Sequence, residues 1–64
     1  MGTTLRALRK KAGLTQAEAA KKMGLGVSTI AMWETGRRKP RIPLFSVIVK
    51  VYGCEIADLF SESE

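Results

Sequence analysis

Glycines at intervals of 11 to 17 residues divide this 64-residue sequence into short segments, and this spacing constrains the fold more than any other feature. Each glycine follows a stretch with helical apolar spacing, and glycine is the preferred residue just past the end of a helix. The glycines that end these stretches are Gly13, Gly24, Gly36 and Gly53. The sequence therefore predicts a set of short helices joined by tight turns.

Five helices are expected, with Thr3 or Thr4 as the N-cap of the first and a capping box, Thr15 with Glu18, at the start of the second. The predicted helices cover residues 5–12, 16–23, 27–34, 43–52 and 56–60. The fold class is accordingly all-α, with one domain over residues 1–64, a basic loop over 36–42 and an acidic tail, 61–64, that should fray. The predicted inner faces carry Leu5, Leu8, Ala12, Ala19, Ala20, Met23, Ile30, Trp33, Phe45, Ile48, Val49 and Tyr52.

The composition excludes several classes of function. The sequence has one cysteine, Cys54, and no histidine, which rules out an internal disulfide, argues against a zinc site and removes histidine-based catalysis. We expect no metal, no cofactor and no enzymatic activity. The apolar stretch 44–52 is interrupted by Ser46 and Lys50 and is far shorter than the ~20 residues of a membrane span, so we expect a cytoplasmic protein without membrane contact.

Charge is distributed unevenly along the chain. Residues 1–54 contain all eleven Lys and Arg residues with only Glu18 and Glu34, a net charge of +9, while residues 55–64 carry −4. A basic body of this kind suggests a polyanionic partner, although basic residues also keep small proteins soluble.

The segment 16–35 has the spacing of a helix-turn-helix motif. Ala20 is small enough for two helices to cross closely, and Gly24 can adopt the positive φ that the short turn needs. Apolar residues would wedge between the two helices, namely Met23, Leu25, Ile30 and Trp33. The outward face of the second helix would then carry Val27, Ser28, Ala31 and Met32. This geometry presents a helix to the major groove of DNA.

Matches at fixed spacing extend well beyond this motif. They are Leu5, Leu8-Arg9, Gly13-Leu14-Thr15-Gln16, Ala19-Ala20, Met23-Gly24, Ile30, Trp33-Glu34, Gly36, Lys39-Pro40, Tyr52-Gly53, Ile56 and Leu59. In these residues the chain resembles the Cro/CI-type (XRE-type) helix-turn-helix DNA-binding domains of phage repressors and bacterial transcription regulators. The resemblance covers residues 5–60 and implies a compact, five-helix, lambda-repressor-like domain that binds a near-palindromic operator in double-stranded DNA as a homodimer.

The resemblance also implies roles for individual residues. Gln16 would contact a phosphate and brace the recognition helix, and Arg9 would form a structural ion pair with Glu34. The base-facing residues would be Val27, Ser28 and Met32; the remaining phosphate contacts would be Thr29, Arg37, Arg38, Lys39 and Arg41. Only the serine can hydrogen-bond a base edge, so we expect modest direct discrimination, a preference for thymine methyl groups and some dependence on DNA shape.

The fourth predicted helix carries a second apolar stripe, formed by Leu44, Val47 and Val51. Such a stripe suggests an interface, unless the helix turns far enough to bury it inside the monomer. The resemblance implies that this interface joins two copies, because the family commonly dimerises through its C-terminal region. The leading interpretation is a sequence-specific transcriptional regulator, most simply a repressor that blocks polymerase. The alternative is a protein-interaction module on the same fold, resembling an antirepressor or an antitoxin, which would use this stripe.

Overall fold

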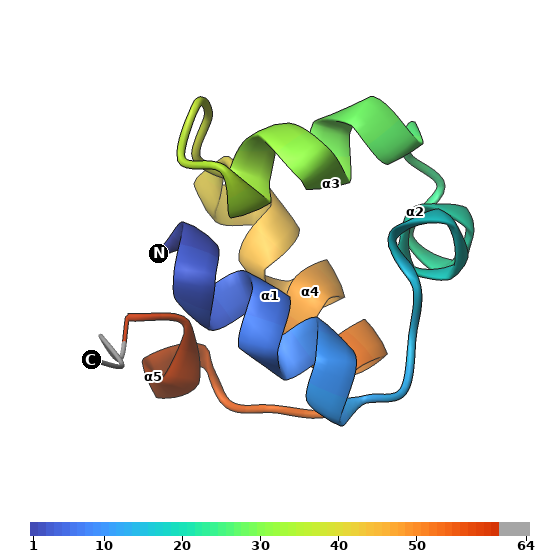
Figure 1. Ribbon diagram of the computed structural model, residues 1–64. Coiled ribbons are helices and arrows are strands. Elements are labelled where there is room, and N and C mark those ends of the chain that lie inside the picture. Colours follow the sequence, from blue (N-terminus) through green and yellow to red (C-terminus); the bar gives the residue numbers. More distant parts are fainter. Residues whose placement is uncertain (61–64) are drawn as a thin grey trace.

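The computed structural model describes residues 1–60, which form five α-helices and no strand (Figure 1). The helices are α1 (Gly2–Lys11), α2 (Gln16–Met23), α3 (Val27–Glu34), α4 (Phe45–Tyr52) and α5 (Ile56–Leu59), with a 3₁₀ turn, η1 (Ile42–Leu44), before α4. The predicted all-α, five-helix fold is confirmed. The predicted fraying of residues 61–64 lies outside the described residues.

The two helices of the motif have the predicted bounds because local signals define them. Thr15 Oγ1 accepts a hydrogen bond from the Glu18 amide at 3.0 Å, and the Glu18 carboxylate accepts one from the Thr15 amide at 2.9 Å, which confirms the capping box. At the other end of α2, Gly24 adopts a φ of +72°, and the amide of Leu25 donates to the carbonyl of Ala20 at 2.9 Å. This left-handed residue turns the chain directly into α3.

Helix α1 begins three residues earlier than predicted. Its N-cap is Met1, and Thr4 is a buried residue of the first turn, so the prediction of Thr3 or Thr4 as the cap is wrong. The start of α1 lies against the backbone at the end of α3: a Cβ on Gly2 would come within 2.7 Å of the Glu34 carbonyl oxygen. Gly2 and Glu34 are far apart in the sequence, so no local sequence pattern indicates this contact or the earlier start of α1.

The start of α4 also differs from the prediction of residue 43. Pro43 has no amide hydrogen, and the Leu44 amide donates to the carbonyl of Arg41 at 2.9 Å, an i→i+3 bond. The first turn is therefore the tighter 3₁₀ form, and the α-helix begins at Phe45.

The core lies where α1, α2, α3 and α4 meet, with α5 closing one end. Its buried residues are Leu5, Ala19, Ala20, Ile30, Trp33, Ile48, Tyr52 and Leu59. Of the other predicted core residues, Leu8, Met23, Phe45 and Val49 are half-buried against this cluster. Ala12 is exposed, contrary to prediction, because it lies just past the last residue of α1, and Arg9 takes a buried position on that helix instead.

Candidate nucleic-acid interface

Helix α3 lies across one end of the molecule, at the top of Figure 1, with α1 beneath it and α2 beside its first turn. Ile30 and Trp33 face the core, which fixes the rotation of α3 about its axis. Val27 and Ser28 consequently face solvent at the first turn, and half of the Val27 surface is exposed. Nothing in the core depends on these two side chains.

A groove of about 200 Å³ runs between α3 and the loop that follows it. Met32 and Thr29, both half-buried, lie on the α3 side of the groove. The loop and η1 supply cations and apolar surface from Arg38, Lys39, Arg41 and Leu44, and Trp33 forms the floor. The groove therefore brings one expected base-facing residue, Met32, next to four of the expected phosphate contacts, Thr29, Arg38, Lys39 and Arg41.

The loop is held against the end of α3 by its backbone. The amides of Arg37 and Arg38 both donate to the carbonyl oxygen of Met32, at 3.0 and 3.2 Å, and the Thr35 hydroxyl donates to the same oxygen at 3.2 Å. These bonds direct the loop back over the last turn of α3. The basic segment therefore has a defined place relative to the helix.

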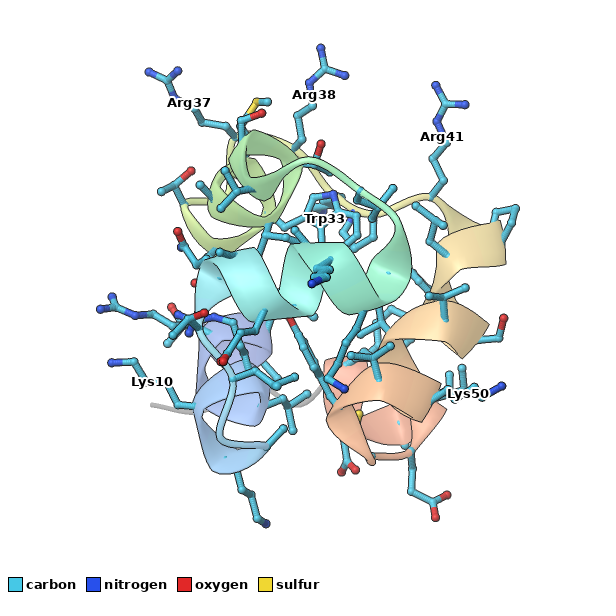
Figure 2. The ribbon with its side chains drawn as sticks, turned by 90° about the vertical axis from the view of Figure 1, so that its right-hand side faces the viewer. Lys10, Trp33, Arg37, Arg38, Arg41 and Lys50 are labelled. Carbon is cyan, nitrogen blue, oxygen red and sulfur yellow. The ribbon has the colours of Figure 1, made fainter. Side chains whose placement is uncertain are left out.

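The side chains of the loop extend away from the body. Figure 2 shows Arg37, Arg38 and Arg41 projecting from the end of the molecule that carries α3, while Lys10 and Lys50 lie lower on its flanks. Within residues 1–60, no carboxylate lies within ion-pair distance of the loop cations. Their charge is therefore available to an external anion.

A buried ion pair joins α1 to the end of α3. Arg9 Nε donates to Glu34 Oε2 at 2.7 Å, and Arg9 Nη2 donates to Glu34 Oε1 at 3.1 Å, so the pair is bidentate. The two side chains are 8% and 3% exposed. Arg9 Nη1 also donates to the carbonyl oxygen of Leu14 at 2.8 Å, which ties the turn before α2 to the same site.

Gln16, at the start of α2, joins this network. Its Nε2 donates to Glu34 Oε1 at 3.1 Å, which ties the start of α2 to the end of α3. The resemblance implied that Gln16 braces this helix, but no local pattern identified Glu34 as its partner. Burial acts to raise the pKa of Glu34, but hydrogen bonds from Arg9 and Gln16 and the charge of Arg9 outweigh it and lower that pKa. Glu34 therefore stays ionised and fixes one of the two amide hydrogens of Gln16.

The residues of the predicted apolar stripe border two different grooves. Leu44, Val47 and Val51 are all half-buried. Leu44 lines the groove beside α3, whereas Val47 and Val51 line a separate open groove of about 770 Å³ with Ala12, Leu14, Lys22 and Lys50. Their assignment to a dimer interface stays a prediction.

Comparison with known proteins places this geometry in a family. A profile of the helix-turn-helix family matches residues 5–59. An uncharacterized HTH-type transcriptional regulator of Archaeoglobus fulgidus is 42% identical over 60 residues, which cover 94% of this chain and 86% of that protein. The cryptic phage CTXphi transcriptional repressor RstR of Vibrio cholerae is 37% identical over 60 residues, and the HTH-type transcriptional regulator PuuR of Escherichia coli is 36% identical over 63 residues.

The matched region contains most of α1 and all of α2 to α5, but it is only part of two of these relatives. This chain covers 54% of RstR and 34% of PuuR, so those two proteins contain sequence with no counterpart here. Among residues 1–60, no helix has the length and apolar character needed to cross a membrane. The matched span includes α2, the turn, α3 and the buried Arg9–Glu34 pair. The chain belongs to the XRE-type helix-turn-helix family of DNA-binding transcriptional regulators.

Proposed function

We propose that this chain is a sequence-specific DNA-binding regulator that inserts the first turn of α3 into the major groove and represses transcription by occupying an operator. The observation that carries the proposal is the placement of the basic loop beside the exposed edge of α3 (Figure 2). In duplex DNA the phosphates flank the base edges of the major groove, so a helix with cations beside it can contact both. The site of action would be the cytoplasm, at the nucleoid.

In this proposal the phosphate contacts come from two sides of α3. Arg37, Arg38, Lys39 and Arg41 bind phosphates at its C-terminal end, and Thr29 binds one from the groove. Gln16, which approaches the same end of α3 from the start of α2, binds a further phosphate with the amide hydrogen that Glu34 leaves free. These contacts set position and register but carry no sequence information.

The reading contacts are few and mostly apolar. Val27 and Met32 pack on thymine methyl groups, and Ser28 hydrogen-bonds one base edge. None of the three makes the bidentate contact that gives strong discrimination of guanine or adenine. We therefore infer a preference for thymine at one or two positions in each half-site, with a further contribution from DNA shape.

We further propose that two copies bind a near-palindromic operator. Half-sites of such operators are one helical turn, ~34 Å, apart. The described part of the chain measures 26 × 23 × 23 Å, so two copies fit side by side on one face of the duplex within that spacing. A bound dimer would repress most simply by excluding polymerase.

A selection experiment tests the sequence-specific part. The purified chain is incubated with a library of random duplexes, bound DNA is recovered through several rounds, and the product is sequenced. Enrichment of a palindrome with half-sites about 10 base pairs apart and conserved thymines supports the proposal. Binding without enrichment of any sequence would mean that the chain contacts only phosphates, without sequence specificity. No binding even at low salt would favour the alternative that the chain is a protein-interaction module.

A salt titration with matched variants tests the phosphate contacts. Arg38→Ala removes a cation beside α3, whereas Lys50→Ala removes an exposed cation from the flank of α4 (Figure 2). The slope of log K against log salt is negative, and each lost phosphate contact reduces its magnitude by about 0.9. We expect that decrease for Arg38→Ala and an unchanged slope for Lys50→Ala. Equal slopes for the two variants would contradict the assignment.

A further inference from the structure

An open groove of about 770 Å³ lies between α2, α4 and the turn after α1, and none of the proposed DNA contacts lines it. The turn and α4 supply its apolar side chains, and α2 and α4 each supply a lysine. The lining residues are Ala12, Leu14, Lys22, Val47, Lys50 and Val51. The groove beside α3 shares none of these residues, so the two surfaces are separate.

Helix α4 has more apolar surface than the core covers. Ile48 and Tyr52 are buried in the core, whereas Val47 and Val51 are half-buried and line the groove. Residues four apart lie on one face of a helix, so the two valines form a short apolar ridge. A helix that is apolar on more than one face is normally covered on more than one face. The ridge is therefore the part of α4 that the monomer leaves incompletely covered.

The groove has a fixed shape. Leu14 and Val51 both pack against the core. The carbonyl oxygen of Leu14 accepts a hydrogen bond from Arg9 Nη1 at 2.8 Å, and the amide of Leu14 donates to the carbonyl oxygen of Arg9 at 3.2 Å. The turn that forms one wall is thus held through both polar groups of one residue. A preformed surface of this kind loses little conformational entropy when a partner binds.

The charges at the groove are all positive. Lys22 and Lys50 are exposed, and among residues 1–60 no carboxylate lines the groove or lies within ion-pair distance of either lysine. A two-fold contact between two copies would set this surface against itself and bring the lysines together. A partner with carboxylates beside its apolar side chains would instead pair with them. Charge therefore favours an acidic partner over a second copy of this chain.

We propose that this groove binds an acidic amphipathic helix of another protein. The apolar side of that helix, with residues spaced three and four apart, packs on Leu14, Val47 and Val51. Carboxylates at its margins pair with Lys22 and Lys50. The open form of the groove suits a helix, because small-molecule sites bury most of the surface of their ligand. This binding does not depend on the proposed function.

The position of the groove allows the partner and DNA to bind at the same time. Figure 2 shows Lys50 on the flank of the molecule, below Arg37, Arg38 and Arg41, which project from the end that carries α3. A helix in the groove would lie beside the duplex rather than in its place. Under the proposed function, such a partner would be brought to the operator and would not displace the chain from it.

Selection from a displayed library of helical peptides tests the proposal. The library keeps apolar residues at positions i, i+3, i+4 and i+7 and varies the flanking positions among glutamate, glutamine and lysine. We expect the enriched peptides to carry glutamate on both margins of the apolar side. Their affinity is then measured by fluorescence anisotropy for the wild type and for variants that circular dichroism shows to be folded.

Two matched pairs of variants locate the binding site. Val47→Ser removes apolar surface from the groove, and Ile42→Ser removes an exposed apolar side chain elsewhere. Lys50→Glu reverses a charge at the groove, and Lys39→Glu reverses one in the loop after α3. We expect about tenfold weaker peptide binding for Val47→Ser and Lys50→Glu and little change for the two controls. The double variant Lys22→Glu/Lys50→Glu should prefer the same peptides with lysine in place of glutamate.

Several outcomes would overturn the proposal. No enrichment, or enrichment without a charge preference, would exclude an acidic helix as the occupant. Equal weakening by Lys39→Glu and Lys50→Glu would mean that the peptides bind through general attraction to a basic chain. Self-association of the peptide-free chain that Val47→Ser abolishes, measured by sedimentation equilibrium, would make a second copy the occupant.

DNA binding is measured separately in the same preparations. Its absence in the wild type would contradict the proposed function without affecting the peptide results. A duplex that binds the chain and displaces the peptide would contradict the separation of the two surfaces.

Discussion

Replacing Arg9 by methionine should remove most of the stability of this domain. Methionine keeps much of the apolar stem of the side chain but cannot pair with Glu34, whose side chain is 3% exposed. The substitution leaves a buried carboxylate with one hydrogen bond from Gln16 and leaves the Leu14 carbonyl without its donor. Breaking one partner of a buried pair costs about 3–5 kcal/mol, because the other charge stays buried.

That cost is large relative to the total free energy of unfolding of the domain. A chain of 64 residues has a total stability of about 3–10 kcal/mol at the usual value per residue. The unfolding entropy of such a chain is about 0.13 kcal/mol/K, so each kcal/mol lowers Tm by roughly 7 °C. Arg9→Met should therefore lower Tm by about 20–35 °C.

Urea and thermal unfolding, followed by the fluorescence of the single buried tryptophan, measure the effect. Arg6→Met is the control, because Arg6 lies exposed on the same helix and should change stability by less than about 0.5 kcal/mol. The double variant Arg9→Met/Glu34→Leu strands no charge and should recover a large part of the loss. Equal losses for Arg9→Met and Arg6→Met, or a double variant no more stable than Arg9→Met, would refute the reasoning.

Two further predictions concern other sites. Gly2→Ala should destabilise the fold by about 1–3 kcal/mol, because the added Cβ would lie 2.7 Å from the carbonyl oxygen of Glu34; an unchanged urea midpoint would show that α1 shifts freely. Burial, together with the nearby charge of Glu34, raises the pKa of Tyr52, the single tyrosine, to about 12, so folding favours its neutral form. The stability gained in this way is complete below pH 10 and is lost as the pH rises toward 12, which ultraviolet titration of the phenolate in folded and urea-unfolded protein would detect as two separated midpoints.

The sequence predicted the helix-turn-helix accurately because the signals there are local. The capping box at Thr15 fixes the start of α2, and the left-handed Gly24 fixes its end and the start of α3. The starts of α1 and α4 were wrong because they depend on other contacts. The first follows from the close approach of Gly2 to the end of α3, and the second from the i→i+3 bond that accompanies Pro43.

At the candidate site, too, the features with local sequence signals were predicted and those that depend on contacts between distant residues were not. Short-range reasoning placed the basic loop after α3, and the backbone bonds to Met32 hold the loop beside that helix. It did not predict the bond from Gln16 to Glu34, which requires the relative placement of α2 and the end of α3. It also missed the exposed apolar side chains of Ile42 and Phe60, which border one hollow, since no periodic pattern connects a residue of η1 with the residue after α5.

On α3, the residues that stabilise the fold differ from the residues that we propose contact the bases of DNA. Val27 and Ser28 face solvent, while Ile30 and Trp33 on the same helix anchor it in the core. Under the proposed function, substitutions of Val27 and Ser28 would change the preferred DNA sequence at little cost in stability. New specificities are then accessible by single steps, each of which leaves a folded protein, so the domain is well suited both to evolutionary divergence and to use as a scaffold for engineered DNA recognition.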